Sequence, residues 1–373
     1  MLTKEKRVII VLPYVNTYRV SLLHSLHDEL ARRRIDLTVT VGAPSGRDHL
    51  RSDAAQDYPS VKLKQFQLRL GRRFVLLRYP PKGWLRADLV ILEQAVKNLE
   101  TYPIILVRKL LGKKTALWGH GMTITEAQSS IQRKIQRWML RTTDWLFAYT
   151  EQSAIRGITN GADRDAVTVL YNTFDTTELA EAISNTKNGV DQNGRWVATY
   201  IGGLDESKRI DVLLRAAEQL YELDIRFLLT IGGHGSMEPD VRALANKPWL
   251  EYLGTVGTTE KAALAARCRI MMIPGRVGLA AIDSFTMATP IVTMSWDYHA
   301  PEFEYLNNTN SVVVDGDEHA YVAAIAELMS DQLRVDLLSS GAALSAKDYP
   351  LTRMRDSFAN GIETATRSDG RPE

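Results

Sequence analysis

The 373-residue sequence lacks several features that mark particular protein classes. Cys268 is its one cysteine, so no intrachain disulfide can form, which fits a reducing cytosol. No apolar run approaches the ~20 residues that cross a bilayer. Basic residues precede the short run Val8–Leu12, but Pro13 ends it and no cleavage site follows. We expect a first buried strand there rather than a signal peptide or a membrane span.

Two kinds of catalytic site are also excluded by what is missing. The sequence has no His-x-x-x-His pair and no second cysteine, which argues against a zinc site. It has no Gly-x-Ser-x-Gly, the turn that carries the nucleophile of many serine hydrolases. We therefore expect no metal and turn to charge and periodicity.

The formal net charge of +2 conceals a strong asymmetry. Residues 1–170 contain 28 Lys and Arg against 15 Asp and Glu, which gives +13, and the remaining 18 against 29 give −11. Such a split often means that one half faces an anionic partner. No nucleic-acid module is recognisable and the second half is acidic, so we expect no nucleic-acid partner.

Basic residues of the first half lie in two places, and both suit an anionic membrane surface. One is the stretch that contains Lys62, Lys64, Arg69, Arg72, Arg73 and Arg78. The other is a helix expected over 131–142. We expect its apolar residues to pack into the core and its basic residues to face outward; these are Ile131, Ile135 and Trp138, and Arg133, Lys134, Arg137 and Arg141.

Short apolar runs alternate with helical patterns along the whole chain, as in parallel sheets covered on both faces. The predicted fold class is α/β, with two doubly wound, Rossmann-like domains facing across a cleft. The polar stretch 174–195 predicts the boundary between residues 1–175 and 176–345. Residues 346–373 would form a C-terminal helix that packs back on the first domain, with a frayed tail. Among the strands expected in the first domain is Val61–Phe66.

Five motifs in order resemble those of the retaining GT-B glycosyltransferases of family four. They cover roughly residues 170–330 and are Asn172 with its neighbours, Ala198–Ala216, Leu229–Gly235, Leu253–Cys268 and Pro274–Val292. The resemblance implies a C-terminal domain that binds a nucleotide-diphospho-sugar and an N-terminal domain that binds an acceptor.

The diphosphate of such a donor needs cations and backbone N–H groups. Gly202 and Gly203 let the chain turn close to a phosphate, and Lys208 with Arg209 stands near the start of a helix. The family places a phosphate-binding lysine at the position of Lys208. It usually has an arginine where Gly203 stands, so Lys208 would carry more of the charge. The alternative is a solvated lysine after a plain turn.

The stretch 274–292 departs from the family, which has two glutamates separated by seven residues. Gly275 replaces the first and Asp283 the second, where the family's acid binds the ribose. Asp283 could equally be a surface aspartate. Phosphate contacts would come from Arg276 and from the amides of Val277, Gly278 and Leu279. Asp163-Arg164-Asp165 resembles the metal-binding pair of another glycosyltransferase fold, but we interpret it as a solvated turn.

Further candidates follow from the same resemblance. His120, between two glycines, would lie against the donor sugar, or would only end a strand. Gly233 would approach the nucleotide and Val256 would lie where the family reads the base. On the acceptor side we name Asn16 and Arg19, although Arg19 could simply begin a helix.

The predicted function is a metal-independent, retaining transfer of a hexose-type sugar to a hydroxyl of a glycan or lipid-linked acceptor, in bacterial cell-surface glycan synthesis. His120 and Lys208 would be catalytic. The donor is a substrate and no cofactor is expected. The expected location is the cytoplasm, either free or peripheral on the inner face of the cytoplasmic membrane. The alternatives are a sugar-nucleotide epimerase or hydrolase, and a non-catalytic relative that binds a nucleotide or a membrane.

Overall fold

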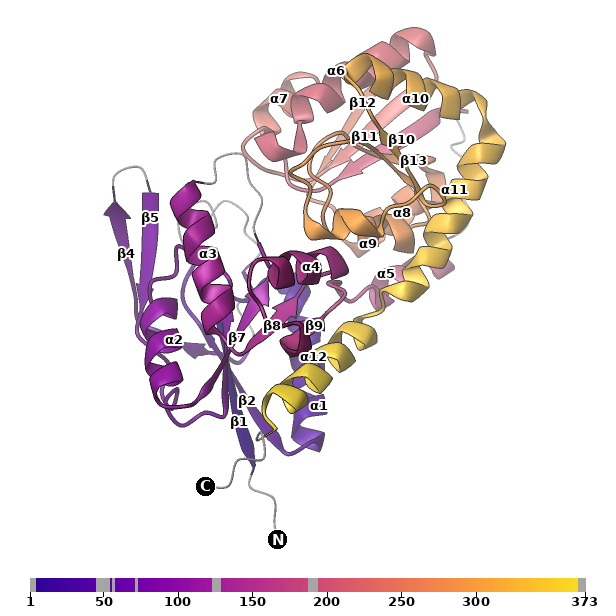
Figure 1. Cartoon of the computed structure of the whole chain (residues 1–373). Helices are drawn as coiled ribbons and strands as arrows, with labels where there is room; N and C mark the ends of the chain where they lie inside the picture. Colours follow the sequence, from indigo (N-terminus) through magenta and orange to yellow (C-terminus); the bar gives the residue numbers. More distant parts are fainter. Residues whose placement is uncertain are drawn as a thin grey trace. The chain divides into compact units, whose positions relative to one another are not determined.

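The computed structural model describes residues 5–44, 54–55, 58–70, 73–122, 129–186 and 194–367. The chain forms two compact units, shown in Figure 1. Unit 1 comprises Met1–Phe174 together with Leu351–Glu373, and unit 2 comprises Asp175–Pro350. None of the helices in the described residues is long and apolar enough to cross a membrane.

Unit 1 is built on a parallel sheet in the order β3-β2-β1-β6-β7-β8-β9. Its strands are β1 (Lys6–Leu12), β2 (Ile35–Val41), β3 (Val61–Lys62), β6 (Leu89–Glu93), β7 (Lys114–Gly119), β8 (Trp145–Ala148) and β9 (Val167–Val169). One face packs against α1 (Val20–Arg32) and α12 (Leu351–Ala365). The other packs against α2 (Thr101–Leu110), α3 (Ser130–Thr142) and α4 (Glu151–Thr159). The antiparallel pair β4 (Gln65–Leu70) and β5 (Arg73–Arg78) forms a separate hairpin.

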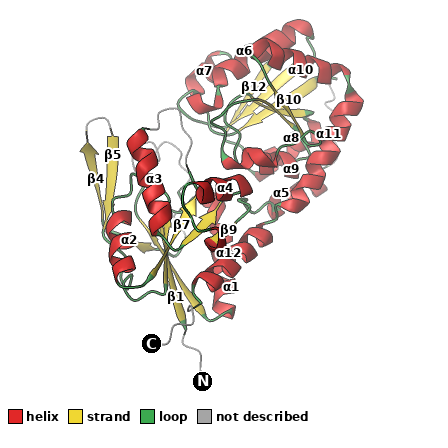
Figure 2. Ribbon diagram, viewed as in Figure 1, coloured by secondary structure: helices red, strands yellow, loops and turns green. Residues whose placement is uncertain are grey.

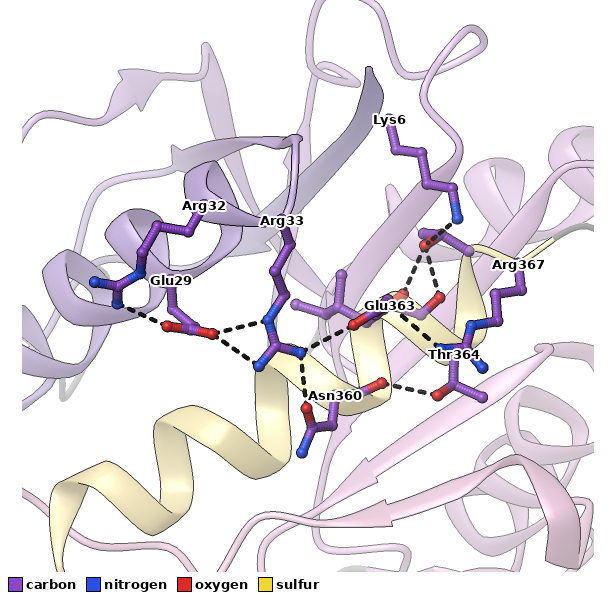
Figure 3. Close-up of polar contacts among 10 residues, drawn as sticks. Lys6, Glu29, Arg32, Arg33, Asn360, Glu363, Thr364 and Arg367 are labelled. Atoms are coloured by element: carbon purple, nitrogen blue, oxygen red, sulfur yellow. Dashed lines mark hydrogen bonds and ion pairs between the residues drawn. The ribbon is translucent and has the colours of Figure 1, made fainter. Parts of the chain in front are cut away.

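The last helix, α12, belongs to unit 1 because its apolar stripe completes that core. Met354, Phe358 and Ile362 recur at helical spacing and are buried. Figure 3 shows the polar contacts beside this stripe: the Arg33 guanidinium binds Glu363 at 3.1 Å and Asn360 at 2.7 Å. The C-terminal segment is thus joined to the end of α1 by packing and by charge.

Unit 2 has a second parallel sheet, in the order β12-β11-β10-β13-β14-β15 (Figure 2). Its strands are β10 (Trp196–Ile201), β11 (Phe227–Gly232), β12 (Leu250–Gly254), β13 (Ile270–Ile273), β14 (Ile291–Met294) and β15 (Ser311–Val314). Its helices are α5 (Thr177–Asn185), α6 (Ile210–Leu223), α7 (Glu238–Ala243), α8 (Thr258–Arg267), α9 (Ala280–Thr286), α10 (Glu318–Ser330) and α11 (Gln332–Ser345).

The predicted fold class is confirmed, but some local expectations are not. The strand expected over Val61–Phe66 is divided between β3 and β4. The units divide between Phe174 and Asp175, at the start of the polar stretch 174–195, and this stretch also contains α5, which packs on α8. Residues 187–193 of the stretch lie outside the described residues.

Arg78 is also not part of an exposed basic surface. Its side chain is 1% exposed and pairs with the equally buried Glu100 at 2.6 Å. The Gln65 side chain accepts a further hydrogen bond from Arg78 at 2.8 Å. Burying a charge is costly unless it is paired and hydrogen-bonded, and sequence periodicity could not reveal the partner of Arg78. Arg72 lies outside the described residues.

Candidate functional site

The strand order of unit 2 reverses at β10, because β11 and β13 flank it on opposite sides. The loops that follow β10 and β13 therefore leave the same edge of the sheet in different directions. Ligands of doubly wound sheets bind in the crevice at this switch point. The segments in question are Gly202–Arg209 and Pro274–Leu279.

These two loops are joined backbone to backbone. The Arg276 amide donates to the Ser207 carbonyl at 2.8 Å, and the Lys208 ammonium donates to the Arg276 carbonyl at 2.6 Å. A Cβ on Gly275 would lie within 2.6 Å of the carbonyl oxygens of both Ser207 and Lys208. Glycine at 275 is thus what allows the loops to touch, and it also explains the missing glutamate.

Lys208 and Arg209 enter α6 through an unusual turn. Arg209 has φ 53° and ψ 48°, the left-handed conformation that is uncommon for a residue with a side chain. Its guanidinium lies 3.5 Å from the Met294 sulfur at the end of β14. The turn holds Lys208 and Arg209 at the switch point.

A second pair of loops meets beside the first. Gly202 has φ 156° and Gly233 has φ 149°, so both occupy backbone conformations that favour glycine. A side chain on Gly233 would collide with the Gly202 carbonyl. The glycines after β10 and β11 therefore let two turns pack without side chains between them. Gly203 lies in the first of these turns, and its carbonyl accepts from the Tyr200 hydroxyl at 2.6 Å.

His299 is a site residue that the sequence analysis missed. Its Nδ1 accepts from the Val277 amide at 3.1 Å, so Nε2 carries the proton and donates to the Met294 carbonyl at 2.9 Å. The ring stacks on Phe303 with centroids 3.9 Å apart. Burial, together with the nearby positive charges of Lys208 and Arg276, lowers the pKa of His299 to about 4, against the opposing effect of its hydrogen bond to the Met294 carbonyl. A neutral histidine thus fixes the loop after β13 in place.

The backbone amides that follow Val277 lie just before the start of α9. Within the described part of the chain, the N–H groups of Gly278 and Leu279 have no hydrogen-bond acceptor, whereas that of Val277 is used by His299. Only Gly278 and Leu279 of the three predicted amides are therefore available to an anion.

Asp283 is buried on α9 rather than exposed at the surface. The Lys261 ammonium of α8 binds its Oδ1 at 2.7 Å. Lys261 was not predicted, because nothing in sequence spacing indicates that α8 and α9 face each other. The pair leaves the second carboxylate oxygen, Oδ2, without a hydrogen bond to any described residue.

The last predicted donor residues line the loops after β11 and β12. The His234 ring lies 3.2 Å from the Thr255 hydroxyl. A Cβ on Gly232 would lie 2.7 Å from both methyl groups of Val256, so Val256 covers the end of β11. Asp163 belongs to unit 1, where its carboxylate accepts from the Asp165 amide in a short turn.

In unit 1 the strand order reverses at β1, between β2 and β6. The residues that follow β1, β6, β7 and β8 gather at that edge. The Arg19 guanidinium donates to the Tyr149 hydroxyl at 2.8 Å, and the His120 ring lies 4.8 Å from the Tyr149 ring. Two predicted residues, Arg19 and His120, are therefore brought together through Tyr149, which was not predicted. Asn16 pairs with Ala54 in an isolated bridge.

A groove lies between α2 and α3 on the other side of unit 1, and it corrects one expectation. Ile131 was expected in the core but is 69% exposed. The groove is lined by Tyr102, Leu106, Ile131, Lys134, Ile135 and Trp138. Leu110, at the end of α2, is 86% exposed. The periodicity identified the apolar face of α3 but could not show that part of it is uncovered.

Replacing Gly275 with alanine tests the contact between the two loops. We expect Gly275→Ala to destabilise the protein by about 1–3 kcal/mol, because the new methyl group must displace backbone atoms. The measurement is urea unfolding. Gly257→Ala is the control, since its methyl group would meet only the flexible Glu260 carboxylate, at 3.2 Å. Equal losses in the two variants would contradict this account of Gly275.

The lowered pKa of His299 predicts a pH-dependent loss of stability. Between pH 6.5 and about 4 the unfolded chain binds a proton at this ring that the folded chain does not, so stability falls as the pH falls. The unfolding free energies of wild type and His299→Asn should therefore converge over this range. A difference that stays constant from pH 7 to pH 4 would show that His299 titrates normally.

One segment of the chain matches a known protein family. Residues 195–331 match the model of the family described as Glycosyl transferases group 1. A search of curated proteins found no match. The matched segment contains both loops of the switch point and most of the sheet of unit 2.

Solved structures match almost the whole chain at low identity. HepE (Alr3699) of Anabaena, solved with UDP, has a TM-score of 0.68 at 14% identity and covers 96% of this chain and 100% of its own. The lipopolysaccharide outer core galactosyltransferase WaaB has a TM-score of 0.66 at 13% identity, with 96% and 99% covered. The pneumococcal O-GlcNAc transferase GtfA has a TM-score of 0.64 at 10% identity, with 98% and 100% covered. Residues 195–331 are therefore similar to the Glycosyl transferases group 1 family, and the chain as a whole has the GT-B fold.

Proposed function

We propose that the protein is a retaining, metal-independent glycosyltransferase that moves a hexose-type sugar from a nucleotide-diphospho-sugar to a hydroxyl of a glycan or lipid-linked acceptor. The observation that carries the proposal is the contact of Lys208 with the loop of Arg276 at the switch point of unit 2. The contact lies inside the segment that matches the family model. Its role would be in cell-surface glycan synthesis.

The chemistry assigned to this site is stabilisation of the leaving diphosphate. When the bond between the sugar and the phosphate breaks, negative charge develops on the phosphate oxygens. Preorganised cations and N–H groups lower the energy of that state without reorganising. Lys208 and Arg276 would supply the charge, with Arg209 in support, and the amides of Gly278 and Leu279 would supply neutral donors. His299 would position these amides through Val277.

Asp283 is assigned to the ribose. Lys261 holds one oxygen of the carboxylate, and the other can accept from a hydroxyl of a diol. The bond to Lys261 orients the carboxylate. A glutamate reaches further than an aspartate, so we expect the ribose to approach α9 closely.

The acceptor side is assigned to the edge of unit 1 where His120, Tyr149 and Arg19 meet. His120 would lie against the donor sugar and orient a hydroxyl. With retention, the acceptor hydroxyl attacks from the face that the leaving group departs from.

HepE has been solved with UDP and with UDP-glucose, which makes UDP-glucose the first donor to test.

Gly275 favours a second candidate, a non-catalytic relative that only binds a nucleotide. A glutamate at this position could not coexist with the observed loop contact. A sugar-nucleotide epimerase or hydrolase would instead consume the donor without an acceptor. Following donor consumption with and without acceptors separates these activities.

We further propose that unit 1 works at an anionic membrane surface, on the cytoplasmic side. The groove between α2 and α3 exposes apolar side chains, and Lys134 lies among them. Lys109 and Arg133 are exposed on the same two helices. Each such cation near an anionic surface contributes about 1 kcal/mol of attraction, and the apolar side chains can enter the interface.

Lys208→Ala tests the donor site. We expect wild type to gain thermal stability on adding UDP or UDP-glucose, and the variant to bind UDP about 10- to 100-fold more weakly, because a charged hydrogen bond to phosphate is lost. The control is Lys247→Ala. Lys247 is exposed and lies before the start of β12, at the end of the sheet opposite to the switch point. If neither UDP, GDP nor their sugars shift the wild-type melting temperature, the proposal is wrong.

Ile131→Ser combined with Leu110→Ser tests the membrane surface. We expect wild type to co-sediment with vesicles that contain phosphatidylglycerol, to bind less as salt rises, and to lose most binding in the double variant. Leu333→Ser with Leu337→Ser is the matched control, since these leucines are 71% and 64% exposed on α11 of unit 2. Absence of binding to anionic vesicles would contradict the proposal.

A further inference from the structure

Arg19 stands in an aromatic setting at the edge of unit 1. Its guanidinium carbon lies 4.4 Å from the Trp118 ring centroid and 5.5 Å from that of Tyr18. One of its nitrogens donates to the Tyr149 hydroxyl at 2.8 Å. These contacts hold the guanidinium in a fixed position.

This arginine is not paired with a carboxylate of the residues that the structure describes. Among the described residues, none of the ion pairs within 4 Å involves Arg19. Glu93 is close enough to interact electrostatically, but its carboxylate accepts from the Asn98 amide at 3.0 Å instead. Burial raises the pKa of Tyr149 to about 12, so its hydroxyl stays neutral and supplies no counter-charge.

The guanidinium also has unused hydrogen-bonding capacity. Its Nε is buried with no acceptor, and the bond to Tyr149 is its one hydrogen bond to the described residues. A guanidinium carries five N–H groups, and a desolvated charge without partners is unfavourable. Arg108 of the same unit, whose side chain is fully buried, instead donates to the carbonyls of Trp84, Ala87 and Lys114.

We propose that Arg19 binds an anionic group of the acceptor, a phosphate or a carboxylate, next to the hydroxyl that receives the sugar. This inference rests on the proposed function, because it assigns the edge of unit 1 to the acceptor. Arg19 follows β1 and shares Tyr149 with His120, so the anion would be held beside the reacting groups. A planar guanidinium suits both oxyanions by forming two parallel hydrogen bonds. A phosphate would come from a lipid-linked acceptor and a carboxylate from an acidic sugar.

The experiment is calorimetric titration of the full chain, with saturating UDP to fill the donor site. The probes are phenyl phosphate, glucuronic acid and, as a neutral reference, methyl glucoside. We expect wild type to bind at least one anion more tightly than methyl glucoside, and Arg19→Gln to bind that anion at least 10-fold more weakly. Binding of phenyl phosphate would identify the phosphate of a lipid-linked acceptor, and binding of glucuronic acid would identify the carboxylate of an acidic sugar.

Three variants make the result specific. Arg19→Lys keeps the positive charge and should retain part of the affinity for the anion. Tyr149→Phe removes the hydrogen bond that orients Arg19, and it should weaken anion binding less than Arg19→Gln does. Arg86→Gln removes an exposed positive charge from the same unit and should change nothing. If Arg19→Gln does not fold, Tyr149→Phe and Arg19→Lys still decide the question.

The proposal is overturned if neither anion binds wild type, or if Arg19→Gln and Arg86→Gln bind the anion equally. Binding of UDP is measured separately on each variant and should not change in Arg19→Gln. Loss of UDP binding in wild type would refute the donor assignment, whereas loss of anion binding alone would refute only the role of Arg19.

Discussion

The contact between the loops after β10 and β13 is the constraint on which the rest of the candidate site depends. Because Gly275 has no side chain, the backbone of Arg276 reaches Ser207, and Lys208 is held by a carbonyl of the same loop. This one contact accounts for the position of the cations, for the open amides of Gly278 and Leu279, and for the loss of an acid at residue 275. His299 supports the contact from the other side through Val277.

The two units use the same topological feature for different chemistry. In each, the strand order reverses and loops from several strands gather at one edge. The edge in unit 2 offers backbone amides and cations fixed by hydrogen bonds, which suits a diphosphate. The edge in unit 1 offers an arginine among aromatic rings, which suits a sugar that carries a charge. The charges of +13 over residues 1–170 and −11 over the remainder follow a similar division.

The sequence predicted the fold and named some residues of the candidate site, because both depend on local patterns. Alternating apolar runs predicted two parallel sheets, and five ordered motifs predicted Lys208 and Arg276 at one site. His299 could not be predicted, since its role depends on a loop that returns to Val277 from 22 residues away. The Arg78–Glu100 pair was missed for the same reason. Ile131 followed helical periodicity, but periodicity cannot show which part of an apolar face other elements leave uncovered.

A crystal structure of the full chain with UDP tests the central claim most directly. The account predicts that the diphosphate lies within hydrogen-bonding distance, about 3 Å, of the Lys208 ammonium and of the Gly278 or Leu279 amide. The hydrogen bond from the Arg276 amide to the Ser207 carbonyl should be unchanged, and Asp283 should accept from the ribose while still bound to Lys261. A nucleotide bound elsewhere in unit 2, or a diphosphate in contact with neither loop, would contradict it.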